Sequence, residues 1–108
     1  MVGGREPVMS VQVQAPGRCD VGVDEEVVIS LEETPTTGYQ WEVADAPQGV
    51  EVDDTRFEPP KSQAPGAAGR RVITVRATAV GEHHLHVQRR RAWEPAAAET
   101  LEVVVNAS

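Results

Sequence analysis

Apolar and polar residues alternate along most of this chain. Within residues 27–31 and again within 39–43, every second residue is apolar. This period of two is typical of half-buried strands, because successive side chains leave opposite faces of the backbone. No window shows the helical period of 3.6. Alternation and turn signals together predict seven strands, at 8–14, 25–33, 39–44, 50–52, 70–80, 83–90 and 99–105.

Short strands separated by turns favour an all-β fold: an immunoglobulin-like antiparallel β-sandwich of about seven strands, with no disulfide. Cys19 is the single cysteine, so no intramolecular disulfide can form. With no base in sight to activate it, we expect Cys19 to be an inert thiol. Residues 55–69 contain Pro59, Pro60, Pro65, Gly66 and Gly69, which predict a long irregular connection, anchored to the core by Phe57.

The 108 residues predict a single domain, 1–108, whose first few residues are flexible. A formal net charge of −7 disfavours nucleic acid as a partner, and we expect the basic run 89–91 to be a solvated strand end. No segment approaches the ~18 apolar residues of a membrane span. Met1–Ser10 lacks the apolar core of a secretory signal. The expected location is therefore cytoplasmic as given, or secreted or periplasmic if a leader was removed.

The stretch Thr34–Tyr39, with the sequence Thr-Pro-Thr-Thr-Gly-Tyr, connects two predicted strands. Pro35 fixes its own φ and favours extended geometry at Thr34. Gly38 accepts a positive φ without steric cost, and threonine hydroxyls can bond nearby backbone groups. These properties predict an ordered loop, which is either a rigid structural turn or a surface that presents its backbone to a partner.

If successive strands run antiparallel, every second connection lies at the same end of the sandwich. The stretch Thr34–Tyr39 then shares its end with the segment that closes on Gly66-Ala67-Ala68-Gly69 and with the segment that opens on Arg91-Ala92-Trp93. Loops gathered at one end of a rigid sandwich commonly form a binding surface. Trp93 lies outside the strand period, so it either packs back onto the core or is an exposed anchor for a partner.

These three motifs, in this order and at these intervals, resemble the chagasin-type inhibitors of papain-like cysteine peptidases. The family patterns are Asn-Pro-Thr-Thr-Gly-Tyr/Phe, a Gly-x-x-Gly stretch and Arg-Pro-Trp, and the resemblance covers Glu25 to Ala107. It implies reversible, non-covalent inhibition of a papain-like cysteine peptidase by three loops that enter the cleft side by side. The implied peptidase-binding residues are Thr34, Pro35, Thr36, Thr37, Gly38, Tyr39, Gly66, Ala67, Ala68, Gly69, Arg91, Ala92 and Trp93.

The resemblance assigns each loop a place. The first covers the catalytic cysteine, where Pro35 to Gly38 let backbone approach the nucleophile. The second lies along one side through backbone hydrogen bonds, and the third supplies Arg91 and Trp93 to the other. Two positions depart from the family. Thr34 replaces Asn, which clamps a turn more firmly, and Ala92 replaces Pro, at a cost of ~0.4–1 kcal/mol. Both changes bear on potency more than on activity.

Other functions have weaker support. His83, His84 and His86 lie on one predicted strand, but no carboxylate or thiolate cluster accompanies them, so we expect solvated histidines, no metal and no cofactor. Nothing in the spacing of the acidic residues predicts a hydrolase site, so we do not expect an enzyme. The alternative is an immunoglobulin-like adhesion or ligand-binding module without a peptidase target. In either case we expect a monomer that binds neither membrane nor nucleic acid.

Overall fold

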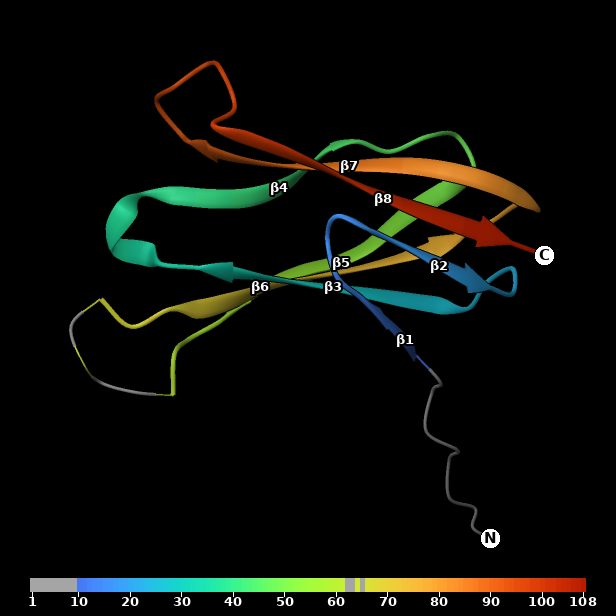
Figure 1. The fold of residues 1–108 in the computed structure, drawn as a ribbon, viewed down its shortest axis with the longest axis horizontal. Coiled ribbons are helices and arrows are strands. Elements are labelled where there is room, and N and C mark those ends of the chain that lie inside the picture. Colours follow the sequence, from blue (N-terminus) through green and yellow to red (C-terminus); the bar gives the residue numbers. More distant parts are fainter. Residues whose placement is uncertain (1–9, 62–63, 65) are drawn as a thin grey trace, which may run out of the picture.

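The computed structural model describes residues 10–61, 64 and 66–108. The expected flexible N-terminal residues lie outside these ranges. The described strands are β1 (Ser10–Val13), β2 (Gly17–Val21), β3 (Glu26–Glu33), β4 (Tyr39–Asp45), β5 (Val50–Glu58), β6 (Gly69–Ala77), β7 (Gly81–Arg91) and β8 (Glu99–Ala107). They form two four-stranded sheets packed face to face, one in the order β1-β3-β6-β5 and the other in the order β2-β8-β7-β4 (Figure 1).

The β-sandwich fold is confirmed, with one strand that the sequence did not reveal. After β1 the chain leaves the first sheet and enters the second as β2. Both strands pair in parallel, β1 with β3 and β2 with β8, whereas the other neighbouring strands pair antiparallel. Only Cys19 and Val21 of β2 face the core, and two apolar residues are too few to establish a period.

The predicted fourth strand was too short. Strand β5 extends from Val50 to Glu58, into the segment expected to be irregular. It is the last strand of its sheet, and a bulge interrupts its pairing with β6 between Val52 and Asp54. Most of its side chains are therefore exposed, so the strand lacks apolar alternation. Phe57 is only partly buried and lies under the guanidinium of Arg71, 5.5 Å from ring centroid to Cζ, instead of anchoring in the core.

The core fills the space between the sheets with the inward-facing residues of both. Its largest fully buried side chains are Val27, Ile29, Ile73, Val75, Leu85, Val87, Val103 and Val105. Each burial of this kind stabilises the fold by about 1.5–3 kcal/mol. Cys19 belongs to this core, where burial chiefly, and then the negative charge of Asp20, raises the pKa of its thiol. A thiol held protonated in this way is a poor nucleophile.

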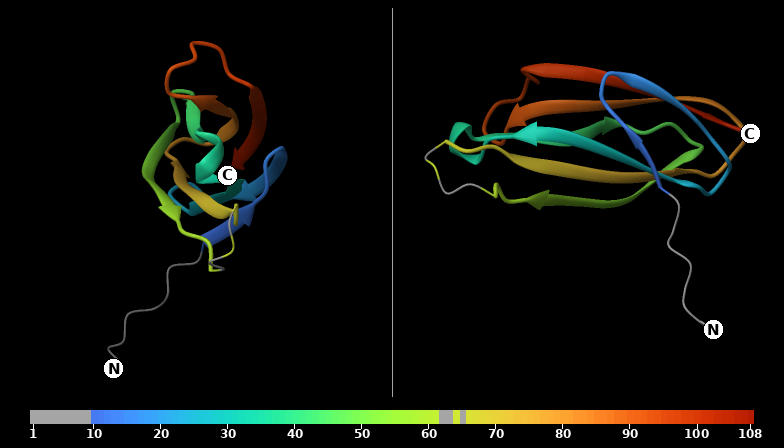
Figure 2. Two further views of the ribbon diagram at one scale, coloured as in Figure 1. Left: turned by 90° about the vertical axis from the view of Figure 1, so that its left-hand side faces the viewer. Right: turned by 60° about the horizontal axis from the view of Figure 1, so that its bottom comes forward.

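Three connections lie at one end of the sandwich (Figures 1 and 2). We call them the first loop (34–38, between β3 and β4), the second loop (59–68, between β5 and β6) and the third loop (92–98, between β7 and β8). The β4–β5 and β6–β7 connections and the C-terminus lie at the opposite end. Within the described residues, no helix has the length and apolar character to cross a membrane.

Candidate functional site

The first loop is held in shape by hydrogen bonds of its own. Pro35–Thr37 form a single 3₁₀ turn, η1, preceded by Thr34 in extended geometry. The Thr34 carbonyl accepts hydrogen bonds from the Thr37 amide (3.1 Å) and the Thr37 hydroxyl (2.8 Å). The Gly38 amide donates to the Pro35 carbonyl (3.0 Å), and Gly38 has a φ of +79°, which favours glycine. The predicted order of this loop is therefore present, although Thr34 makes no capping bond with its side chain.

The tip of the first loop offers mainly backbone to solvent. Pro35, Thr36 and Thr37 are exposed, and their side chains are short. Because the tip contains no long or charged side chain, another molecule could approach its main chain closely. Tyr39 follows at the start of β4, and its amide donates a hydrogen bond to the Thr37 hydroxyl oxygen (3.2 Å).

The third loop places an exposed indole beside the first. Trp93 is 71% exposed, so it does not pack back onto the core. The indole nevertheless contacts the first loop, because a Cβ at position 38 would lie only 2.9 Å from the Trp93 Cη2 atom. Gly38 is thus required twice, by its φ and by the ring against it. Ala92 beside the indole is exposed as well.

Arg91 connects the third loop to the first. Its Nε–H donates a hydrogen bond to the Thr37 carbonyl (3.0 Å). Its guanidinium carbon lies 4.1 Å from the centroid of the Tyr39 ring, which is its cross-strand neighbour, and 5.8 Å from the centroid of the Trp93 ring. A guanidinium over an aromatic face is attracted by the ring quadrupole. Arg91 is therefore a component of the site's own structure as well as a candidate contact.

Residues 89–91 are a strand end, as expected, but they are only partly exposed to solvent. Strand β7 continues through all three, and each has a partner within the protein. Arg89 lies over the ring of Trp41, its cross-strand neighbour, at 5.7 Å from the centroid. Arg90, on the other face, pairs with the carboxylate of Glu42 at 3.2 Å. At the loop end of β4 and β7, arginines of β7 therefore lie over the aromatic rings of their cross-strand neighbours in β4.

The two glycines of the second motif have different roles. Gly66 is exposed, with a φ of +74°, and no described atom lies within 4 Å of where its Cβ would be. Gly69 is buried at the start of β6, where a Cβ would collide with the Glu58 carbonyl oxygen and lie 2.6 Å from the Phe57 ring. Gly66 therefore permits a turn, whereas Gly69 permits close packing. Ala67 and Ala68 between them are partly buried.

A groove of about 380 Å³ separates the first and second loops. Its lining is short and largely apolar: Pro35, Thr36, Pro59, Pro60, Ala64, Gly66 and Ala67. Seen end-on, the first loop lies between the second and the third (Figure 2). The structure thus brings together the three motifs that were predicted to share one end of the sandwich. The first loop lies in the middle.

Sequence reasoning missed two residues directly beneath these loops. Glu33 is buried at the end of β3, and Arg71 lies two residues into β6, where the two side chains form an ion pair. The alternation of the strands was the available signal. Glu33 lies two residues after the inward-facing Leu31, and Arg71 lies two residues before the inward-facing Ile73, so the alternation indicates an inward-facing position for both. A charged residue at an inward position normally has a buried partner.

The histidines are not as isolated as the sequence suggested. The sheet places His84 between Glu102 and Glu82, each 3.1 Å from a ring nitrogen, and His86 lies 3.4 Å from Glu102. The hydrogen bond to Glu102 and then that to Glu82 raise the pKa of His84. Carboxylates from two strands therefore lie beside these histidines, which the spacing along the chain did not indicate. Even so, the described residues include no group of three or more such side chains arranged to hold a metal ion.

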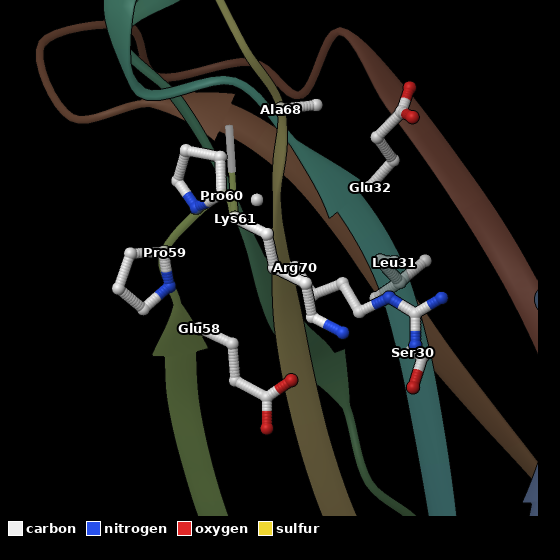
Figure 3. Close-up of a pocket in the computed structure, with 10 residues that line it drawn as sticks. Ser30, Leu31, Glu32, Glu58, Pro59, Pro60, Lys61, Ala68 and Arg70 are labelled. Carbon is white, nitrogen blue, oxygen red and sulfur yellow. The ribbon is translucent and has the colours of Figure 1, made fainter. Parts of the chain in front are cut away.

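A hollow of about 550 Å³ lies at the base of the second loop. Figure 3 shows Glu58, Lys61 and Arg70 reaching over it from β5, the second loop and β6. Its lining contains neither a histidine nor a cysteine.

A rigid β-sandwich with three adjoining loops at one end has the form of a binding protein. Residues 20–106 match the family model described as Chagasin family peptidase inhibitor I42. The chain therefore belongs to the chagasin family of peptidase inhibitors, and it is an inhibitor, not an enzyme. A comparison with curated protein sequences gives no match.

Solved structures with similar folds include a cysteine protease inhibitor. The cysteine protease inhibitor EhICP2 from Entamoeba histolytica has a TM-score of 0.77 at 20% identity, with 95% of this chain and 100% of that chain covered. Amebosin, solved in solution, has a TM-score of 0.75 at 26% identity over the same shares. PbICP-C, solved in complex with falcipain-2, has a TM-score of 0.61 at 17% identity, covering 97% of this chain and 95% of that one.

Proposed function

We propose that this protein is a reversible, non-covalent inhibitor of papain-like cysteine peptidases that blocks the active-site cleft with its three loops. One observation carries the proposal: the three family motifs lie side by side at one end of the sandwich, and Trp93 is exposed next to the Gly38 turn. Family membership and the resemblance to a cysteine protease inhibitor support the class of target. The alternative of an adhesion module has no comparable support.

The first loop would occupy the centre of the cleft, over the catalytic cysteine. Its exposed residues Pro35, Thr36 and Thr37 are compact enough to let the main chain reach the bottom of a narrow groove. Its internal hydrogen bonds fix the tip before binding. A surface already ordered in the free protein loses less conformational entropy on association, which favours affinity without any covalent step.

The outer loops would contact the two walls of the cleft. On one side, Gly66, Ala67 and Ala68 would present backbone groups, while buried Gly69 would keep the loop close to β5. On the other side, the indole of Trp93 would be the aromatic anchor. Arg91 would hold that indole against the first loop, through its bond to the Thr37 carbonyl.

Titration of papain with the intact protein tests this proposal. We expect competitive inhibition, full recovery of activity on dilution, and an unchanged mass of both proteins after incubation. A folded protein that fails to inhibit papain and a panel of related peptidases at micromolar concentration would instead favour the adhesion module. Recovery of a cleaved or covalently linked inhibitor would contradict the non-covalent mechanism.

A further inference from the structure

The junction beneath the loops contains a buried ion pair that the described motifs do not include. Arg71 holds the carboxylate of Glu33 with two parallel hydrogen bonds, Nε to Oε1 at 3.2 Å and a terminal nitrogen to Oε2 at 2.8 Å. The Glu33 side chain is 4% exposed and the Arg71 side chain 16%. Bidentate pairing of this kind fixes the relative orientation of both groups, not merely their distance.

The same carboxylate also joins the two sheets. Glu33 Oε1 accepts a hydrogen bond from the amide of Trp41 at 2.8 Å, and the indole Nε1 of Trp41 donates to the Glu32 carbonyl at 3.0 Å. Glu33 belongs to β3 in the first sheet, and Trp41 to β4 in the second. One carboxylate is therefore bonded on both sides of the first loop, at the strand before it and the strand after it.

Arg71 extends this junction to the second loop. It lies two residues after Gly69, where β6 leaves the second loop, and its guanidinium covers the ring of Phe57, next to the end of β5. Register places Glu33 directly opposite Gly69. The pair thus connects both ends of the first loop to both ends of the second.

A buried ion pair is a poor way to gain stability, since desolvation of two charges offsets much of their attraction, and apolar replacements are often as stable. Its effect here is geometric. From these contacts we infer that Glu33 and Arg71 are positioning residues for inhibition: together they set the spacing and angle between the first and second loops, and so keep the groove between them open. This inference rests on the proposed function, in which both loops enter one cleft.

The test replaces both charges at once, because Arg71→Met alone would leave a buried carboxylate unpaired and could unfold the protein. In the double variant Glu33→Gln/Arg71→Met, the glutamine oxygen can still accept the Trp41 amide, and methionine can cover Phe57. We expect this variant to keep the wild-type midpoint of urea unfolding or exceed it, yet to inhibit papain at least tenfold more weakly. Arg71→Lys keeps the charge but not the bidentate geometry, so its inhibition of papain should be weaker than that of the wild type and stronger than that of the double variant.

Arg76→Met is the matched control. Arg76 lies on the same strand at the opposite end, where it pairs with Asp24, Glu51 and Asp53. This variant should lose some stability and inhibit as the wild type does. If Arg76→Met inhibited papain as weakly as the double variant, the loss would be a general effect of charge or stability. If the double variant inhibited papain as well as the wild type does, the ion pair would have no part in inhibition. Either result overturns the inference.

A second measurement needs no peptidase. Hydrogen exchange of the loop amides reports loop order directly, through the Thr37 and Gly38 amides in the first loop and the Ala67 amide in the second, all of which are hydrogen-bonded within their own loops. We expect exchange to accelerate at least tenfold in both loops of the double variant and in neither loop of Arg76→Met. If the wild type inhibits nothing, the proposed function fails, while this exchange still decides whether the ion pair orders the loops.

Discussion

The indole of Trp93 packs against Gly38. Arg91, two residues before the indole, donates a hydrogen bond to the carbonyl of Thr37, 54 positions earlier in the chain. The space that a Cβ would take at position 38 is occupied by the ring. The first and third loops are therefore packed together before any partner arrives.

Gly38→Ala should damage both the fold and inhibition. Alanine at a φ of +79° costs about 1–2 kcal/mol, and its methyl group would also displace the indole. Gly66→Ala is the matched control for stability, because Gly66 has nearly the same φ, +74°, with no described atom near its Cβ. Urea unfolding should show a larger loss for Gly38→Ala than for Gly66→Ala. Equal losses would mean that the indole moves aside freely.

Trp93→Ala should weaken inhibition while leaving the fold intact. Loss of an aromatic anchor costs about 2 kcal/mol or more in binding, which is roughly a thirtyfold rise in the inhibition constant. Because the side chain is 71% exposed, the free energy of unfolding should change by no more than about 0.5 kcal/mol. Val80→Ala, at the opposite end and 72% exposed, should change neither quantity. An unaltered inhibition constant for Trp93→Ala would remove the indole from the interface.

Arg91→Lys should weaken inhibition although the charge is kept. Lysine lacks the Nε–H that binds the Thr37 carbonyl and the planar group that lies over Tyr39. Loss of one hydrogen bond of this type corresponds to about 0.5–1.5 kcal/mol, or up to roughly tenfold in affinity. Inhibition kinetics and hydrogen exchange of the Thr37 amide measure the two effects. Weaker inhibition with unaltered exchange would indicate a direct contact with the peptidase instead.

Stability should fall as the pH rises past neutrality because of His84. Hydrogen bonds to Glu102 and then to Glu82 raise the pKa of His84 in the folded protein above the value of about 6.5 in the unfolded chain. The stabilisation is thus fully present below about pH 6.5 and is lost as the pH rises through the folded-state pKa. The unfolding midpoint of the wild type should exceed that of His84→Gln at pH 5.5 by more than at pH 8.5. A constant difference between the two proteins would exclude this ionisation as the cause.

The sequence determined the architecture because alternation of apolar residues is a local property. Val27, Ile29 and Leu31 had to share one face of a strand, whichever partner that face met. The order of turns along the chain likewise placed all three motifs at one end. The sequence showed the three arginines at 89–91 but not their partners, because those partners belong to β4, the neighbouring strand in the sheet.

The tertiary structure decided what supports the site. The alternation along the chain indicated that Glu33 and Arg71 face inward. Their meeting depends on the β3–β6 register, which places Glu33 opposite Gly69 and so brings together two side chains 38 positions apart. Exposure of Trp93 and its contact with Gly38 likewise depend on how two separate connections pack. Period and turn chemistry act between near neighbours, so the sequence reveals them; register and loop packing are collective, and only the folded chain shows them.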